Sequence, residues 1–123
     1  MIDPLSRTAI YEQLVEQLET LILKGAVQQG EQLPSVRTLS IKLSVNPNTI
    51  QKAYNEMDSR GLIYSVPGKG CFVSMDAKER LIESTREKLP MLDSLLARLK
   101  LGRIPKLTVI EHVEMVYQGG VSV

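Results

Sequence analysis

A link of only two residues between two helical segments is the feature that most constrains this fold. Residues 34–43 carry apolar side chains at helical spacing, with Ser35 as the expected cap, and a second helical segment begins at Asn46. Only Ser44 and Val45 lie between the end of the first segment and Asn46. So short a link forces the two helices to cross at a steep angle, which predicts a helix-turn-helix.

The second helix has clear start and stop signals. Asn46 is a favoured N-cap, and Pro47 suits the first helical position because its φ is already helical and its missing N–H costs nothing there. The helix is predicted to end near Arg60, where Gly61 supplies a left-handed stop. Its apolar stripe is Ile50, Ala53, Tyr54 and Met57. Its outward face carries Asn48, Thr49, Gln51, Lys52 and Asn55.

Two interpretations of this outward face are open. It is an ordinary solvated surface, or it reads DNA, because amides, a hydroxyl and a cation are what base edges and phosphates require. A winged helix that binds a protein would instead need an apolar or acidic outward face. The polar and cationic side chains argue against that function, which remains the alternative candidate.

A β-hairpin is predicted directly after the second helix. Residues 62–66 and 71–74 are rich in β-branched and aromatic side chains, and they flank Pro67-Gly68-Lys69-Gly70. Pro followed by Gly is typical of a type II turn. A hairpin in this place is a wing with Lys69 at its tip. The tip is either a solvated loop or a contact to DNA phosphate or the minor groove.

An amphipathic helix over residues 9–24 completes a three-helix bundle. Ser6 or Thr8 is the expected cap, and Gly25 the expected stop. Its apolar face carries Ile10, Leu14, Val15, Leu18, Leu21 and Ile22. The predicted fold class is therefore mainly α with a small β-hairpin, and residues 1–75 are expected to form a winged helix-turn-helix domain.

Residues 76–123 are predicted to form a short helical dimerisation tail. Pro90 interrupts its helical spacing, which predicts either one kinked helix or two helices that meet near Leu89. A turn and a last helix from about residue 106 or 108 follow. Two or three helices bury little surface by themselves, so their apolar faces predict a two-fold homodimer. The expected dimer contacts are Leu92, Leu95, Leu96, Leu99, Val109, Val113 and Val116.

Composition argues against several other function classes. One Cys and one His provide neither an intrachain disulfide nor a zinc cluster, and no residue set suggests an enzyme, a metal site or a cofactor. Cys71 is either a small buried hydrophobe or a redox-sensing thiol, and His112 is either an interface residue or a metal ligand or pH sensor. With no signal peptide and no apolar run of about 18 residues, we expect a cytoplasmic protein without a membrane partner.

The distribution of charge is more informative than the net charge of +1. Arg37, Lys42 and Lys52 lie between Leu33 and Asn55, a stretch without a single acidic residue. A locally basic face on a nearly neutral chain is sufficient for DNA binding, and it predicts a modest salt dependence.

Most of the first 75 residues resemble the N-terminal domain of the GntR family of bacterial transcription regulators. The Asn-Pro-Asn-Thr sequence and the short tail resemble its YtrA-like subfamily. The matching pieces are residues 30–40, 45–54, 61–63 and 68–73. The resemblance implies a sequence-specific regulator, chiefly a repressor, that binds double-stranded DNA. In a homodimer the two recognition helices would lie about 34 Å apart and would read a palindromic operator. It also suggests a transporter operon as the target.

Transferred onto matching positions, the resemblance implies where DNA is touched. The expected contacts are Ser35, Arg37, Asn46, Asn48, Thr49, Gln51, Lys52, Gly68 and Lys69. Many family members have Arg where this chain has Pro47, so their operator sequence is not assumed. The tail has no room for the large effector domain of other subfamilies. An unidentified small-molecule effector, if one exists, is expected at the dimer interface or between the tail and the DNA-binding domain.

Overall fold

The structure is a computed structural model that describes residues 2–119. It divides into two compact units, one ending at Ser84 and one beginning at Thr85, which we call unit 1 and unit 2. The elements in chain order are α1 (Ile10–Lys24), α2 (Val36–Leu43), α3 (Pro47–Ser59), β1 (Ile63–Val66), β2 (Gly70–Val73), α4 (Ala77–Arg86), α5 (Leu89–Leu101) and α6 (Lys106–Tyr117). The predicted fold class, mainly helical with one small hairpin, is confirmed.

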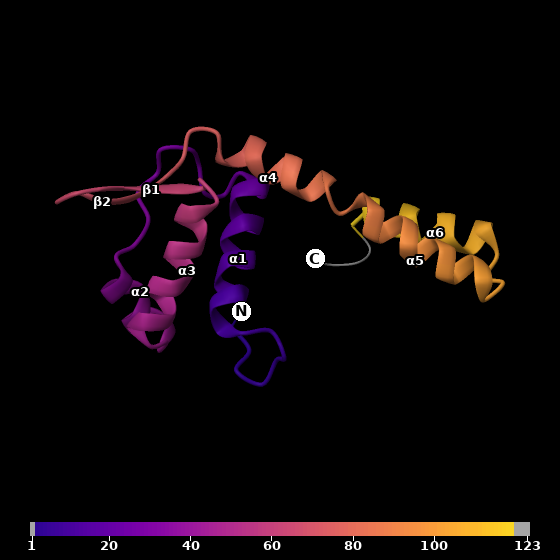
Figure 1. The fold of residues 1–123 in the computed structure, drawn as a ribbon, viewed down its shortest axis with the longest axis horizontal. Helices are drawn as coiled ribbons and strands as arrows, with labels where there is room; N and C mark the ends of the chain where they lie inside the picture. The colour runs from indigo at the N-terminus through magenta and orange to yellow at the C-terminus, as the bar shows by residue number, and fades with distance from the viewer. Residues whose placement is uncertain (1, 120–123) are drawn as a thin grey trace. The chain divides into compact units, whose positions relative to one another are not determined.

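Helix α3 is the centre of unit 1, where it packs against α1, α2 and β1 (Figure 1). All four residues of its predicted apolar stripe are buried, and Ile50 and Met57 are 0% and 1% exposed. Three of the four apolar residues of α2 pack on the same core from its edge, Val36, Leu39 and Leu43, while Ile41 is exposed. The predicted three-helix bundle is therefore present, and α3 is held along one full face.

The helix ends follow the sequence signals, with one exception. Asn46 caps α3 by accepting the Asn48 N–H at 2.8 Å, and Ser35 caps α2 by accepting the Thr38 N–H at 3.0 Å. The predicted side-chain cap on α1 is wrong, because Ala9 occupies the N-cap position there without a side-chain bond. The chain before α1 is held instead by Gln13, whose amide group bonds to backbone atoms of Asp3 and Thr8. Gln13 is buried although it lies outside the apolar stripe of α1, so no periodicity marks it.

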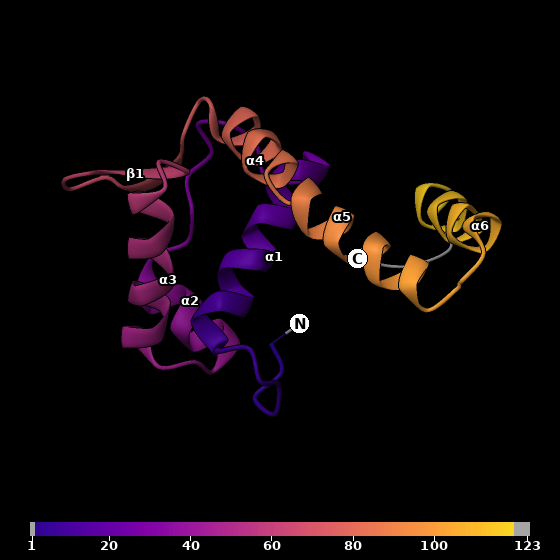
Figure 2. The same cartoon turned by 45° about the vertical axis from the view of Figure 1, so that its right-hand side comes forward.

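Strands β1 and β2 pair antiparallel, from Ile63 opposite Val73 to Val66 opposite Gly70. The Lys69 N–H donates to the Val66 carbonyl at 2.9 Å, and Gly68 has a φ of 77°, so the predicted type II turn is confirmed. In both ribbon views the hairpin projects beyond the three helices (Figure 2).

The connection between α1 and α2 runs along the second strand of the hairpin. The Leu33 N–H donates to the Cys71 carbonyl, and the Val73 N–H donates to the Glu31 carbonyl, both at 2.9 Å. Gln32 lies opposite Phe72 in an isolated bridge. The hairpin is therefore anchored on one edge by a third chain segment, which the sequence did not predict.

Unit 1 extends further along the chain than the boundary expected after residue 75, because Ala77 and Leu81 of α4 are buried in its core. Helices α4 and α5 are separate helices, which resolves the two alternatives left open for the proline. Pro90 lies in the first turn of α5, where a missing N–H breaks no helical hydrogen bond.

Unit 2 consists of α5, α6 and the turn between them, where Arg103 has a φ of 60°. None of its described residues is buried. Leu96, Leu99 and Val109 are half-buried, and the other predicted dimer contacts are exposed. In the described part of the chain, no helix is both long enough and apolar enough to cross a membrane.

Candidate nucleic-acid interface

The N-terminal half of α3 presents free hydrogen-bonding groups to solvent. Asn48 and Gln51 are exposed, and Thr49 is partly exposed. The Asn48 side chain makes no hydrogen bond to any described residue, whereas the Gln51 amide donates to Asn55 Oδ1 at 2.8 Å and keeps its own oxygen free. Asn46 uses its oxygen as the cap and retains its amide N–H groups. These are the donor and acceptor groups that base edges pair with.

A cleft of about 480 Å³ brings together residues from three elements of unit 1. Ser35 at the start of α2, Gln51 on α3, and Gly68 and Lys69 at the hairpin tip all line it. A helix N-terminus carries partial positive charge, and Lys69 adds a full one. The cleft therefore has the positive electrostatic sign that favours an anionic group such as a phosphate.

The expected cationic contacts differ in their availability. Arg37 and Lys69 are exposed, and their side chains form no hydrogen bond or ion pair with the described residues. Lys52 is also exposed, but its Nζ lies 4.1 Å from the centre of the Tyr11 ring on α1. This cation–π contact turns Lys52 toward α1, so the structure does not bring it into the cleft.

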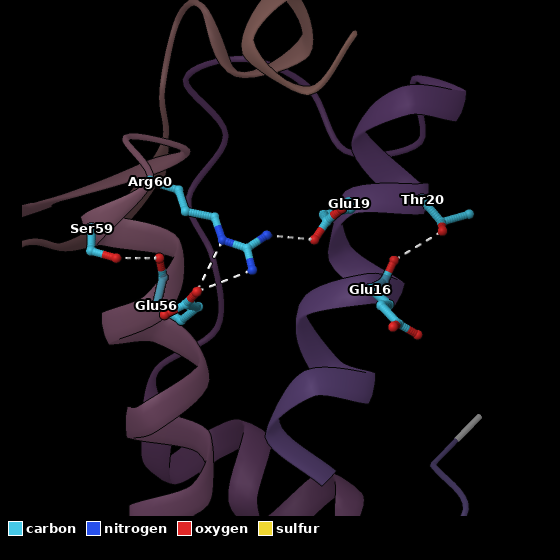
Figure 3. Close-up of polar contacts among 6 residues, drawn as sticks. All are labelled: Glu16, Glu19, Thr20, Glu56, Ser59 and Arg60. Atoms are coloured by element: carbon cyan, nitrogen blue, oxygen red, sulfur yellow. Dashed lines mark hydrogen bonds and ion pairs between the residues drawn. The ribbon is translucent and has the colours of Figure 1, made fainter. Parts of the chain in front are cut away.

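Acidic residues are concentrated at the other end of α3, where Arg60 joins it to α1 (Figure 3). The guanidinium contacts Glu19 and Glu56, each at 3.0 Å. Because Arg60 is 45% exposed, solvent weakens these pairs, and we assign the arrangement about 1 kcal/mol or less. Both carboxylates are therefore paired with a cation at the end of α3 opposite its free N-terminal half.

Tyr54 connects the buried and exposed faces of the helix-turn-helix. Its hydroxyl donates to the Pro34 carbonyl at 2.7 Å, directly before the Ser35 cap of α2. Burial, with a smaller contribution from Cys71, raises the pKa of Tyr54 to about 12, so the hydroxyl keeps its proton at neutral pH. This bond fixes the start of α2 against the middle of α3.

Sequence patterns missed two residues that shape this surface. Gln32 donates from Nε2 to the Lys69 carbonyl at 2.7 Å, and Tyr11 holds Lys52. Gln32 belongs to no apolar stripe, cap or turn, so only the path of the chain between α1 and α2 reveals it. Tyr11 packs against the core with the apolar stripe of α1, but only the packing of α1 on α3 reveals its contact with Lys52.

The structure also places Cys71 and His112, the two residues for which the sequence left alternatives open. Cys71 is half-buried in β2 and is not in a disulfide, with its Sγ 3.3 Å from Ser65 Oγ. His112 is exposed on α6. Across residues 2–119 no group of three His, Cys, Asp or Glu side chains is placed to hold a metal ion.

Comparison with known proteins agrees with this geometry. A family model described as bacterial regulatory proteins, gntR family, matches residues 10–73. The chain is 43% identical over 98 residues to the HTH-type transcriptional repressor YtrA of Bacillus subtilis (strain 168). The aligned residues make up 80% of this chain and 73% of YtrA.

Solved structures show the same likeness. A GntR family transcriptional regulator from Listeria monocytogenes superposes with a TM-score of 0.75 at 33% identity, over 89% of this chain and 96% of that one. The DNA-binding domain of AraR in complex with operator ORX1 superposes with a TM-score of 0.54 at 33% identity, over 60% of this chain and 92% of that one.

Proposed function

The chain belongs to the gntR family of bacterial regulatory proteins, and on that premise we propose that it is a homodimeric repressor of a palindromic DNA operator. The family's function is DNA-binding transcription regulation, and its members are not enzymes. The observation that carries the proposal is the row of unpaired polar groups on α3 beside a cleft with a basic tip. Polar side chains alone also suit a solvated surface, so the adjacent cleft with its basic tip is what favours DNA.

In the proposed complex, residues 1–75 form the DNA-binding domain and the N-terminal half of α3 enters the major groove. Asn48 and Gln51 read base edges, while Arg37 and Lys69 contact phosphates. The solved complex of the AraR DNA-binding domain with an operator supports operator binding by a domain of this fold. Asn46, Thr49, Gly68 and Ser35 complete the contact surface, and Lys52 joins it only by leaving the Tyr11 ring.

The proposed dimerisation tail is residues 76–123, and within it unit 2 of one chain packs on the same unit of a second chain. Leu92, Leu95, Val113 and Val116 are each between 44% and 57% exposed. Burying the exposed half of such a side chain stabilises an interface by roughly 1 kcal/mol. A two-fold dimer would present two recognition helices to half-sites about 34 Å apart.

The relative YtrA is named a transcriptional repressor, which supports repression rather than activation. A repressor dimer bound to an operator would block the polymerase. We extend the proposal, by resemblance to YtrA-like regulators, to the operon of a transporter and to the cytoplasm as the place of action. An effector, where there is one, would act at the unit 2 interface.

The test is a fluorescence-anisotropy titration of the protein against the DNA upstream of its own gene and against a scrambled duplex, at two salt concentrations. We expect preference for the upstream DNA, with two chains bound per site. Asn48→Ala should cost about 1–3 kcal/mol on that DNA and much less on the scrambled duplex.

Lys69→Ala is the matched control in this titration, because a phosphate contact carries no sequence information. It should weaken binding to both duplexes alike and reduce the salt slope by about one. Weak and equal binding of the unaltered protein to both duplexes would contradict the proposal for this operator and would favour the alternative, a winged helix that binds a protein.

A further inference from the structure

Gln32 joins the connection between α1 and α2 to the tip of the hairpin. Its backbone lies opposite Phe72, and its side chain extends along the strand so that Nε2 donates to the Lys69 carbonyl at 2.7 Å. Sequence separation between the two residues is large, so the bond is a tertiary contact and not part of the turn itself.

The bond acts at the point where the hairpin needs support. A two-stranded hairpin with four-residue strands is marginal by itself, and its tip is its least restrained part. The Lys69 N–H is already used within the turn. Holding the Lys69 carbonyl as well fixes the peptide plane on both sides of the Lys69 Cα, and hence the direction in which its side chain leaves the backbone.

The residue after Lys69 is shaped to admit this bond. Gly70 has a φ of 121°, a conformation that L side chains rarely adopt. A Cβ at this position would lie 2.8 Å from Gln32 Nε2, too close for any real contact. Glycine therefore serves both the backbone path of the wing and the approach of the Gln32 amide.

We propose that Gln32 is a positioning residue for DNA binding: by holding the Lys69 carbonyl, it aims the Lys69 ammonium at the phosphate backbone across the cleft that both residues line. The inference rests on the proposed phosphate contact of Lys69. It adds a residue outside the helix-turn-helix and the wing to the DNA-binding machinery.

The test substitutes Gln32→Met, which keeps length and neutrality but removes the donor. Gln28→Met is the matched control, because Gln28 is an exposed glutamine of the same connection whose side chain bonds to no described residue. Binding is measured on a scrambled duplex at several salt concentrations. A phosphate contact contributes on any sequence, so this arm does not depend on finding an operator.

We expect Gln32→Met to weaken binding about threefold to tenfold, the equivalent of one hydrogen bond, and to lower the salt slope toward that of Lys69→Ala. Gln28→Met should bind as the unaltered protein does. In a Lys69→Ala background Gln32→Met should change affinity less than about twofold, because no ammonium is left to aim.

Three outcomes would overturn the inference. Unchanged binding by Gln32→Met would mean that the tip is held without it. An equal loss in the Lys69→Ala background would mean that Gln32 acts independently of Lys69. Unchanged binding by Lys69→Ala would remove the premise. A lost operator preference with these salt effects intact would instead contradict only the proposed sequence-specific function.

A second measurement on the free protein keeps the bond itself testable. The carbonyl ¹³C chemical shift of Lys69 should move in Gln32→Met and stay in place in Gln28→Met. A shift that stays in place in both variants would show that the hydrogen bond is not made in solution.

Discussion

Unit 1 and unit 2 are built from helices of similar length, yet only unit 1 has a core. Unit 1 buries apolar residues from every helix except α2 and from both strands. Unit 2 buries none of its described residues, and beyond Arg86 its described side chains form no hydrogen bond or ion pair. An amphipathic pattern thus predicts a helix in both units, but a core only where a third layer is available to cover the stripe.

The largest expected effect comes from removing a side chain in unit 1. Ile50→Ala should lower the free energy of unfolding by about 2–5 kcal/mol, because Ile50 is 0% exposed and its removal leaves a cavity among packed neighbours. Urea denaturation measures the change, and the loss should not depend on protein concentration. Leu101→Ala, at a position that is 76% exposed in unit 2, is the control and should change stability by about 0.5 kcal/mol or less.

The next effect tests whether unit 2 depends on a second chain. Leu95→Asp should raise the dimer dissociation constant about 30-fold or more, because it would bury an unpaired carboxylate in the proposed interface. Sedimentation velocity over a range of concentrations measures the constant. Ser94→Asp, on the opposite side of α5, introduces the same charge and should leave it unchanged. If both variants sediment as the unaltered protein does, the comparison between the units fails.

A smaller effect concerns Tyr54 at alkaline pH. The unfolded tyrosine loses its proton near pH 10 and the folded one near pH 12, so stability falls as pH rises between these values, by at most about 2.7 kcal/mol. Tyr54→Phe removes this contribution but also the Pro34 hydrogen bond, which costs about 1 kcal/mol at neutral pH.

Urea denaturation at pH 9 and pH 12 separates these two contributions. The unaltered protein should be the more stable of the two at pH 9 and should lose that advantage at pH 12. A constant difference between the two proteins would mean that Tyr54 ionises as easily in the folded chain as in the unfolded one.

The smallest effect belongs to the surface ion pairs at the end of α3. Arg60→Ala should cost about 0.3–1 kcal/mol and the loss should shrink in high salt, because the pairs with Glu19 and Glu56 are partly exposed. Thermal unfolding measures it. Arg80→Ala removes an exposed pair with Asp76, the residue before α4, and should cost less, since the two partners are only four residues apart in the chain. A larger loss of stability in Arg80→Ala than in Arg60→Ala would show that the ion pair between α1 and α3 adds nothing to the free energy of unfolding.

Sequence patterns correctly predicted the features that depend on short-range interactions along the chain. The caps at Asn46 and Ser35, the stripe of α3 and the turn at Gly68 depend on near neighbours in the chain, and each is found as expected. The hold of Gln13 on the chain before α1 depends on a buried amide that no period marks.

The site shows the same division. The exposed face of α3 follows from its helical spacing, but the capture of Lys52 by Tyr11 and the support of the wing by Gln32 join residues far apart in the sequence. Such contacts depend on how the elements pack, and a pattern of single residues does not encode them. The extension of unit 1 into α4 has the same origin, since Ala77 and Leu81 become core residues only once the hairpin has returned the chain to the bundle.

The turn between α2 and α3 contains a residue in a strained backbone conformation. Ser44 ends α2 with a φ of 55°, a left-handed conformation that usually favours glycine and costs other residues roughly 1 kcal/mol or more. Ser44→Gly would relieve that strain but would also widen the range of angles available to the turn. A glycine at this position would therefore exchange relief of backbone strain for a less restricted crossing of α2 and α3.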